Sequence, residues 1–237
     1  MMPRDNTITS TDTLQFDARG TPVSSYFDDV YFDREDGLAE SRYVFLAGNS
    51  LPKRWQAHAE FTLVETGFGT GLNLLATWQA WRQAQPAQAW LHYLSIEGYP
   101  LQAHEIANAL TPWPELAALG DRLLAQYPRA TPGCHQLRFP EDRLQVTLFF
   151  ADIAPALTSI AAPVHAWYLD GFAPAKNPAM WQPALFQTMA ACTPQGGTAA
   201  TFTVAGLVRR GLAAAGFTVD KTPGFGAKRE VLQAVRD

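Results

Sequence analysis

Short apolar runs alternate with longer amphipathic stretches along most of the chain. The apolar runs predict strands at 61–64, 91–96, 144–150, 165–169, 197–204, 217–219 and 231–235. Helical periodicity lies between them at 72–83, in pieces within 100–130 and at 207–215. Strands that alternate with helices form parallel sheets covered on both faces, so we predict an α/β fold with a mostly parallel, seven-stranded sheet.

The first sixty residues carry a different pattern. Short alternating runs flank a turn at Arg19-Gly20-Thr21-Pro22, which predicts a β-hairpin. Residues 37–51 have helical spacing, and this helix is expected to end near Gly48-Asn49. We therefore interpret residues 1–60 as a hairpin-and-helix extension that packs on a main domain of residues 61–237.

Composition narrows the class of protein. The chain has 237 residues, of which 47% are hydrophobic, enough for one large core. Its net charge of −4 excludes a bulk positive field, although a local basic face still suits RNA. Cys134 and Cys192 are far apart and lack metal-ligand spacing, and no apolar stretch is long enough to span a bilayer. We expect a cytoplasmic protein with no metal site, no disulfide and no membrane partner.

Acidic residues stand at or beside the ends of four predicted strands. They are Glu65, Glu97, Asp152 and Asp170. Ligands of parallel sheets bind beyond the carboxyl ends of the strands. These carboxylates therefore mark the expected binding edge of the sheet.

A glycine-rich loop, Glu65-Thr66-Gly67-Phe68-Gly69-Thr70-Gly71, follows the first of these strands. Glycine allows positive φ and close approach of a ligand, and the helix beyond offers N–H donors to an anionic group. A dinucleotide fingerprint needs a small residue where Leu72 stands, which disfavours NAD and FAD. The spacing instead resembles the first motif of class I methyltransferases that use S-adenosyl-L-methionine (SAM), which have Rossmann-like folds. A tight turn without a ligand is the alternative.

Two further carboxylates suit the rest of this cofactor. Glu97 is expected to accept hydrogen bonds from both ribose hydroxyls, and Asp152 from the adenine amine. The alternatives are a solvated strand-end acid for Glu97 and a helix N-cap for Asp152.

The loop Asp170-Gly171-Phe172-Ala173-Pro174 is the candidate catalytic segment. It resembles the Asp/Asn-Pro-Pro-Tyr loop of amino-group methyltransferases, in which the acid and a carbonyl hold the amine while the aromatic ring stacks on the base. Asp170 would orient an amine and receive or relay its proton; the alternative is an Asp that caps its own loop. Lys176 would meet a phosphate or remain a surface charge, and Trp181 would wall the pocket or belong to the core.

Several strings resemble one family in order along nearly the whole chain: Glu65–Asn73, Leu169–Pro178, Phe27–Phe32, Gly37–Leu46, Thr201–Thr203 with Arg209–Leu212, and Gly224–Glu230. The family is the methyltransferase part of MnmC, also found as stand-alone MnmD enzymes. The resemblance implies methylation of the aminomethyl group of 5-aminomethyl-2-thiouridine at the tRNA wobble position, giving 5-methylaminomethyl-2-thiouridine. An unpaired anticodon base can be splayed out and stacked at modest cost.

The motifs together define the candidate site. Candidate cofactor-binding residues are Glu65, Gly67, Phe68, Gly69, Thr70, Gly71, Asn73, Glu97, Asp152 and Asp170, and candidate substrate-binding residues are Gly171, Phe172, Lys176, Arg209 and Arg210. Basic residues that could meet phosphates of a tRNA anticodon loop are Arg42, Lys53, Arg54, Arg209, Arg210, Lys228 and Arg229, with ion pairing or solubility as the alternative. Tyr26, Phe27, Tyr31 and Phe32 would either roof the pocket or belong to a core.

Bifunctional members of the family carry a C-terminal FAD-dependent oxidase domain that prepares the amine. This chain ends soon after Glu230 and has no second glycine-rich dinucleotide motif, so we expect no FAD here. The expected partner is either a fused oxidase domain or a separate oxidase. Two other functions stay open: an NAD(P)-dependent oxidoreductase on a similar sheet, and a non-catalytic adaptor that binds SAM or RNA.

Overall fold

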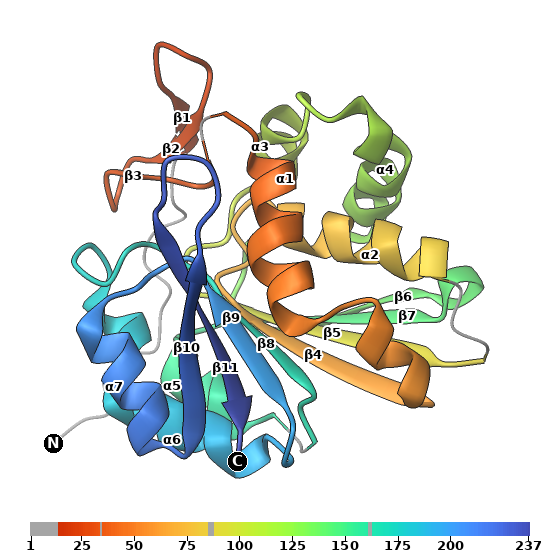
Figure 1. Cartoon of the computed structure of the whole chain (residues 1–237). Coiled ribbons are helices and arrows are strands. Elements are labelled where there is room, and N and C mark those ends of the chain that lie inside the picture. The colour runs from red at the N-terminus through yellow and green to blue at the C-terminus, as the bar shows by residue number, and fades with distance from the viewer. Residues whose placement is uncertain (1–13, 34, 85–87, 161–162) are drawn as a thin grey trace, which may run out of the picture.

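The computed structural model describes residues 14–33, 35–84, 88–160 and 163–237. All seven predicted strands are present in the main sheet: β4 (Glu60–Thr66), β5 (Trp90–Glu97), β7 (Leu144–Phe150), β8 (Ala166–Leu169), β9 (Thr198–Thr201), β10 (Phe217–Pro223) and β11 (Glu230–Arg236). Strands β9, β8, β4, β5 and β7 run parallel to one another. Strand β11 pairs antiparallel with β9, and β10 pairs antiparallel with β11. The α/β class and the mostly parallel sheet are confirmed (Figure 1).

The predicted strand number is wrong, because β6 (Gly133–Phe139) adds an eighth strand antiparallel to β7. The sheet order is β10-β11-β9-β8-β4-β5-β7-β6, so β6 is an edge strand. Only Leu137 and Phe139 of β6 are buried. Such a sparse apolar pattern gives no clear strand signal, and the pairing comes from the hairpin with β7.

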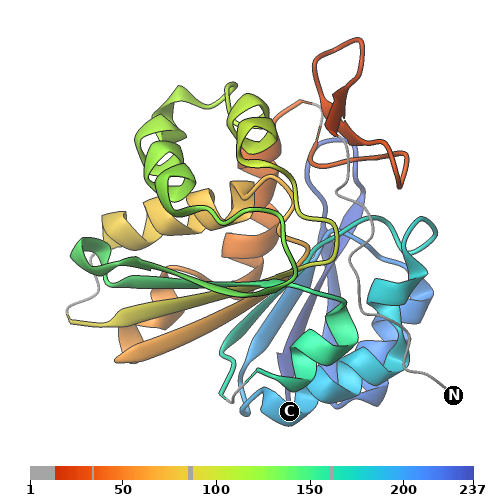
Figure 2. The same cartoon turned by 180° about the vertical axis from the view of Figure 1, so that it is seen from behind.

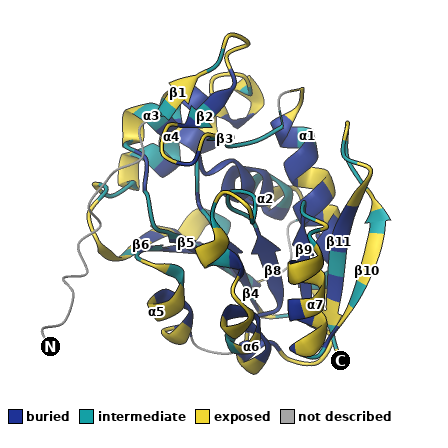
Figure 3. Ribbon diagram, turned by 90° about the vertical axis from the view of Figure 1, so that its left-hand side faces the viewer, coloured by how far each residue is buried: buried dark blue, intermediate teal, exposed yellow. Residues whose placement is uncertain are grey.

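Helices cover both faces of the sheet, as predicted (Figures 1 and 2). One face carries α1 (Gly37–Ser41), α2 (Leu72–Ala84), α3 (Ala103–Ala109) and α4 (Ala117–Gln126), and the other carries α5 (Ile153–Thr158), α6 (Pro183–Cys192) and α7 (Gly206–Ala214). Short 3-10 turns cover Lys53–Ala57, Pro114–Leu116, Pro140–Asp142 and Pro178–Trp181. Each face buries its own hydrophobic cluster, and the helices expose their outer sides (Figure 3).

The N-terminal extension forms a small separate sheet of order β1-β2-β3. Strands β1 (Leu14–Phe16) and β2 (Pro22–Ser24) form the predicted hairpin, and β3 (Asp29–Val30) adds a third short strand. The Asp17 carboxylate stabilises the turn by accepting bonds from the N–H groups of Arg19 and Thr21.

The predicted helix over 37–51 begins at Gly37 and ends at Asn49, close to its expected end. It is regular α-helix only to Ser41 and continues as π-helix over Arg42–Leu46 and 3-10 helix over Ala47–Asn49. Phe45 and Trp55 are buried in the same cluster as residues of the main sheet. The division of the chain at residue 60 therefore stays a prediction.

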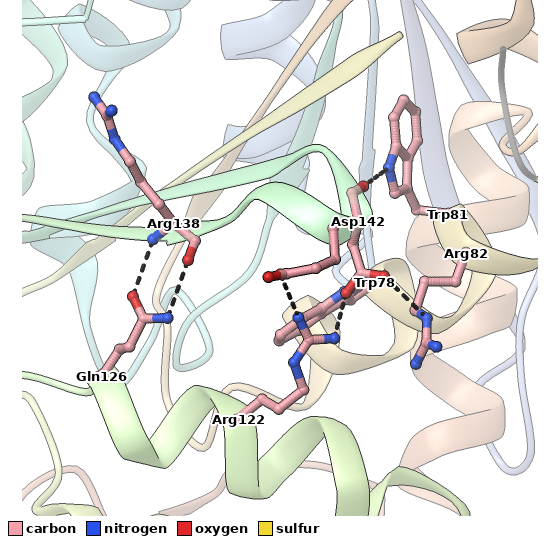
Figure 4. Close-up of polar contacts among 8 residues, drawn as sticks. Trp78, Trp81, Arg82, Arg122, Gln126, Arg138 and Asp142 are labelled. Carbon is pink, nitrogen blue, oxygen red and sulfur yellow. Dashed lines mark hydrogen bonds and ion pairs between the residues drawn. The ribbon is translucent and has the colours of Figure 1, made fainter. Parts of the chain in front are cut away.

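A group of side chains that we call the Asp142 cluster ties α2 and α4 to the turn before β7 (Figure 4). The Asp142 carboxylate accepts bonds from Trp78 Nε1 at 2.9 Å and an Arg122 guanidinium nitrogen at 2.5 Å, and it pairs with Arg82 Nε at 3.1 Å. Its backbone oxygen accepts a bond from Trp81 Nε1 at 2.8 Å. Because Asp142 precedes β7, this cluster lies at the edge of the sheet away from the strand carboxyl ends.

In the described part of the chain, no helix is long and apolar enough to cross a membrane.

Candidate active site

A cavity of about 760 Å³ lies beyond the carboxyl ends of β4, β5, β7 and β8. This is the edge at which the predicted carboxylates were expected, and the volume suits a small-molecule ligand. The glycine-rich loop, the Asp170 loop, the N-terminal extension and the loop between β10 and β11 all contribute to the lining.

Glycine is required where the glycine-rich loop passes the Asp170 loop. Gly67 has φ of +86°, and a Cβ there would lie 2.9 Å from the Cα of Gly171. The Gly67 N–H donates to the Ile96 carbonyl at 2.7 Å, which joins the loop to the end of β5. Larger residues would separate the two loops, so Gly67 sets their close approach.

A chain of neutral donors, which we call the Asp170 network, connects the buried Glu65 carboxyl group to the half-buried Asp170 carboxyl group. Asn73 Nδ2 donates to Asp170 Oδ2 at 2.6 Å and to Glu65 Oε1 at 2.9 Å. Ser41 Oγ donates to Asn73 Oδ1 at 2.5 Å, and Ser95 Oγ donates to Glu65 Oε2 at 2.6 Å. The Gly171 N–H donates to Asp170 Oδ1 at 2.8 Å. These contacts fix the orientation of the Asp170 carboxyl group in the cavity wall.

Burial raises the pKa of both carboxyl groups. For Asp170 it raises the pKa to about 7, opposed by the hydrogen bonds from Gly171 and Asn73. For Glu65 it raises the pKa to about 8, opposed by the hydrogen bonds from Ser95 and Asn73. A carboxyl group that changes charge near neutral pH and lines a cavity is suited to bind or exchange a proton with an amine.

Glu97 and Asp152 line the same cavity. Glu97 accepts bonds from the N–H groups of Gly69 at 2.9 Å and Tyr99 at 2.8 Å. Its carboxylate therefore connects the glycine-rich loop to the end of β5. Asp152 stands at the N-cap position of α5, but its side chain makes no capping hydrogen bond. The capping alternative therefore does not account for the exposed Asp152 carboxylate.

The N-terminal extension lies against the Asp170 loop. The Phe27 and Phe172 rings stack with centroids 4.5 Å apart, and Tyr31 meets Phe172 edge-on at 5.3 Å. Asp29 Oδ2 accepts a bond from the Ala173 N–H at 3.1 Å. Phe27, Tyr31 and Phe32 line the cavity, as the roofing interpretation predicts, whereas Tyr26 lies outside the lining and is 60% exposed.

The lining contains most of the candidate residues, namely Gly67, Phe68, Gly69, Thr70, Asn73, Glu97, Asp152, Asp170, Gly171 and Phe172. Five described candidates lie outside it: Glu65, Gly71, Lys176, Arg209 and Arg210. Lys176 pairs instead with Asp28 at 3.0 Å. Trp181 is buried in the core, and its Nε1 donates to the Phe172 carbonyl at 3.1 Å, which supports the loop from behind.

The candidate RNA-binding cations have different surroundings. Arg54 lies at the start of β8 and β9, where it donates to Thr198 Oγ1 at 2.6 Å and to the carbonyls of His165 and Gly196. These bonds tie Arg54 to the amino ends of β8 and β9, at the edge of the sheet opposite to the cavity, and its contact with RNA stays a prediction. Arg42 donates to Gln79 Oε1 at 2.6 Å. Among the described candidate cations, Lys228 alone lines the cavity.

Sequence reasoning did not assign roles to Glu40, Ser41 or Asp29, all of which line the cavity or contact its loops. They fall inside the family-like strings Gly37–Leu46 and Phe27–Phe32, so the signal was available. In the described residues, no group of three or more His, Cys, Asp or Glu side chains is arranged to hold a metal ion.

Comparison with known sequences gives a family match. The family described as S-adenosyl-L-methionine-dependent methyltransferase matches residues 114–237, just over half of the chain. The bifunctional tRNA 5-methylaminomethyl-2-thiouridine biosynthesis protein MnmC of Methylobacillus flagellatus is 51% identical over 215 residues, which cover 90% of this chain and 33% of that protein. The MnmC of Maricaulis maris is 49% identical over 214 residues, covering 90% and 37%. The chain thus spans about a third of the length of these curated relatives.

Comparison with solved structures supports the fold. The crystal structure of MnmC2 from Aquifex aeolicus superposes with a TM-score of 0.76 at 20% identity, covering 95% of this chain and 70% of that one. A precorrin-6Y C5,15-methyltransferase from Geobacter metallireducens superposes with a TM-score of 0.50 at 10% identity, covering 94% and 98%. At these identities the likeness concerns the fold alone.

Proposed function

The chain belongs to the S-adenosyl-L-methionine-dependent methyltransferase family, and we propose that it methylates the aminomethyl group of 5-aminomethyl-2-thiouridine at the tRNA wobble position. The observation that carries this proposal is the Asp170 carboxyl group, which faces the same cavity as the glycine-rich loop. The names of the relatives from Methylobacillus and Maricaulis support the choice of substrate.

The cavity residues fit SAM. Gly67 and Gly69, both with positive φ, shape the loop that lines the cavity, while Glu97 and Asp152 present carboxylates at the ends of the next two parallel strands. We assign Glu97 to the ribose hydroxyls and the uncapped Asp152 to the adenine amine. When bound, SAM supplies an electrophilic methyl group on a positively charged sulfur.

Glu65 has a supporting role in this proposal. Its side chain is fully buried, and its oxygens contact Asn73 and Ser95. It therefore holds Asn73, and through Asn73 it positions Asp170. Gly71 likewise shapes the turn, since it has φ of +75° and packs against the Phe68 ring.

Asp170 is the proposed catalytic residue. An alkylamine has a pKa of about 10, so at neutral pH its nitrogen carries an extra proton and lacks a lone pair for attack. The ionised Asp170 carboxylate binds this ammonium group and takes its proton, which frees the nitrogen lone pair. With SAM bound, this lone pair would form the new N–C bond as the methyl–sulfur bond breaks, and the electron pair of that bond would stay on the sulfur. Phe172 would stack on the base and keep the amine aligned with the methyl group.

The proposal includes the partners and the location of the reaction. We infer that an oxidase domain or a separate oxidase prepares the amine, because the curated relatives are bifunctional and this chain spans about a third of them. We assign Arg209 and Arg210, exposed on α7, and Lys176 to phosphates of the anticodon loop. A cytoplasmic location agrees with the two free thiols, Cys134 and Cys192.

Methyl transfer to RNA tests the proposal. The protein is incubated with methyl-labelled SAM and tRNA carrying 5-aminomethyl-2-thiouridine, and the nucleosides are analysed by mass spectrometry. The expected product is 5-methylaminomethyl-2-thiouridine in stoichiometric yield. If SAM raises the melting temperature but no wobble uridine gains a methyl group, the chain is a SAM-binding adaptor and the proposal fails. Stabilisation by NAD instead of SAM would favour the oxidoreductase alternative, which the family match does not support.

A further inference from the structure

A lysine from the far end of the chain reaches into the substrate side of the cavity. Lys228 lies in the loop between β10 and β11, and both views of the fold show this loop beside the N-terminal extension (Figures 1 and 2). The loop is fixed there by Tyr43, whose hydroxyl donates to the Pro223 carbonyl at 2.9 Å. Lys228 Nζ lies 4.8 Å from the centre of the Phe202 ring, another lining residue.

The Lys228 ammonium is held by a buried carboxylate. It donates to Glu40 Oε1, while Glu40 Oε2 accepts a bond from the Asp33 N–H at 3.0 Å. Glu40 is 7% exposed, whereas the Lys228 side chain is 38% exposed and lines the cavity. An ammonium group has three donors and no acceptor, so the pair with Glu40 leaves Lys228 able to donate into the cavity.

A second lysine on the same hairpin shows the contrast. Lys221 of β10 pairs with Glu230 of β11 at 2.7 Å, both side chains are 45% exposed, and neither residue lines the main cavity. Such a surface pair contributes little to stability or binding. Lys228 differs from Lys221 because its carboxylate partner, Glu40, is buried and because Lys228 lines the main cavity.

The chemistry of the substrate gives Lys228 a target. In a uracil substituted at C5, the neighbouring ring carbon carries the O4 carbonyl, a hydrogen-bond acceptor. When the aminomethyl group reaches Asp170, O4 lies one ring position away and therefore enters the cavity that Lys228 also lines. The Glu40 charge raises the pKa of Asp170 and the Lys228 charge lowers it, because both charges lie near the Asp170 carboxyl group. At the matching position cytosine presents an amino group, which is a donor.

We propose that Lys228, positioned by Glu40, donates a hydrogen bond to O4 of the target base and thereby selects uracil over cytosine. This inference rests on the proposed function and assigns the base-reading residue of the same site. Glu40 is a positioning residue, because it acts through Lys228. Lys228 and cytosine would present donors to each other, so the cytosine base is disfavoured.

Matched RNA substrates test the assignment. Anticodon stem-loops containing 5-aminomethyl-2-thiouridine or 5-aminomethyl-2-thiocytidine at the wobble position are compared by kcat/KM for methyl transfer. The wild-type protein should prefer the uridine RNA by about 10- to 100-fold, the value of one charge-assisted hydrogen bond. Lys228→Met should reduce this preference to less than about 3-fold by slowing the uridine reaction, with SAM affinity unchanged. Lys221→Met is the control and should keep the wild-type preference.

Lys228→Gln gives an independent readout if Lys228→Met fails to fold. Glutamine both donates and accepts, so it should relax the preference while methylating both RNAs. A wild-type preference in either Lys228 variant overturns the inference. So does an equal loss on both RNAs that shrinks as salt is raised, because that result assigns Lys228 to a phosphate. If the wild-type protein methylates neither RNA, the proposed function fails instead.

Discussion

Two carboxyl groups at opposite edges of the sheet are held in opposite ways. Asp142 faces two guanidinium groups, from Arg82 and Arg122, and an indole N–H (Figure 4). Asp170 accepts bonds from an amide and a backbone N–H, which are neutral. The nearby Lys228 ammonium is bonded to Glu40 rather than to Asp170.

The difference separates a structural carboxylate from a functional one. Guanidinium groups compensate the Asp142 charge and let it join α2, α4 and the turn before β7. Asp170 is desolvated without a directly bonded cation, and its pKa rises to about 7. A cationic substrate amine would supply the missing charge, so the site stays incomplete until the substrate binds.

Removing the Asp170 charge should have the largest effect. Asp170→Asn keeps the size of the side chain but cannot take a proton, so turnover should fall by about 10²- to 10⁴-fold. SAM affinity, measured by calorimetry, should stay within about 3-fold of wild type because other residues hold the cofactor. An equal loss of SAM affinity and turnover would make Asp170 a cofactor ligand instead. The matched control, Asp142→Asn, should retain wild-type turnover per folded molecule.

The control variant, Asp142→Asn, should have a lower stability than wild type. Asp142→Asn removes the charge from two ion pairs and weakens the bond to Trp78. Both arginines are partly exposed, so we expect a loss of about 2 to 3 kcal/mol, or roughly 4–12 °C in Tm. A Tm within about 1 °C of wild type would show that the cluster is not structural.

The buried Glu65 carboxyl group, which like Asp170 has no bonded cation, should make stability depend on pH. Its pKa in the folded protein is raised from about 4.5 to about 8, so the folded state binds more protons than the unfolded state between these values. The Glu65 contribution to stability therefore falls as pH rises through this window. Glu65→Gln keeps the shape and removes the titration. It should raise Tm by at least about 2–4 °C at pH 9 and have no such effect at pH 4, whereas a loss at pH 9 would refute the buried-charge account.

The smallest effect is expected at the rim. Lys176 pairs with Asp28, whose side chain is 91% exposed, and such pairs contribute about 0–1 kcal/mol. Lys176→Ala should leave Tm within about 2 °C of wild type and raise the KM for tRNA by about 2- to 5-fold at low salt, an increase that shrinks as salt is raised because one phosphate contact is lost. An unchanged KM at low salt would show that Lys176 makes no phosphate contact.

The sequence predicts the local features of this molecule well. The glycine-rich loop around Gly67 was predictable because glycine allows positive φ, and the Asp170 loop because an acid ends a strand within a family-like string. Both predictions use only residues that are adjacent in the sequence. The edge strand β6 is missed because its side chains are mostly polar and its pairing depends on β7.

Long-range contacts could not be predicted from the sequence. Glu40 and Lys228 are 188 residues apart, and nothing in either local pattern shows that they meet. Arg54 carries the charge that suits a phosphate, yet only the structure shows that it bonds Thr198 at the start of β9. Glu65 is a motif residue, yet only the structure shows that it contacts Asn73 behind the cavity wall.

The pH dependence of methyl transfer tests the central claim, that the ionised Asp170 carboxylate receives the substrate amine. We would measure kcat/KM with SAM and RNA both well below saturation, so that the free enzyme is reported. The account predicts a rise through a pKa of about 7 and a plateau until the amine loses its proton near pH ~10, with no inflection near 7 in Asp170→Asn. A wild-type profile that is flat between pH 6 and 8, or the same inflection in Asp170→Asn, would contradict it.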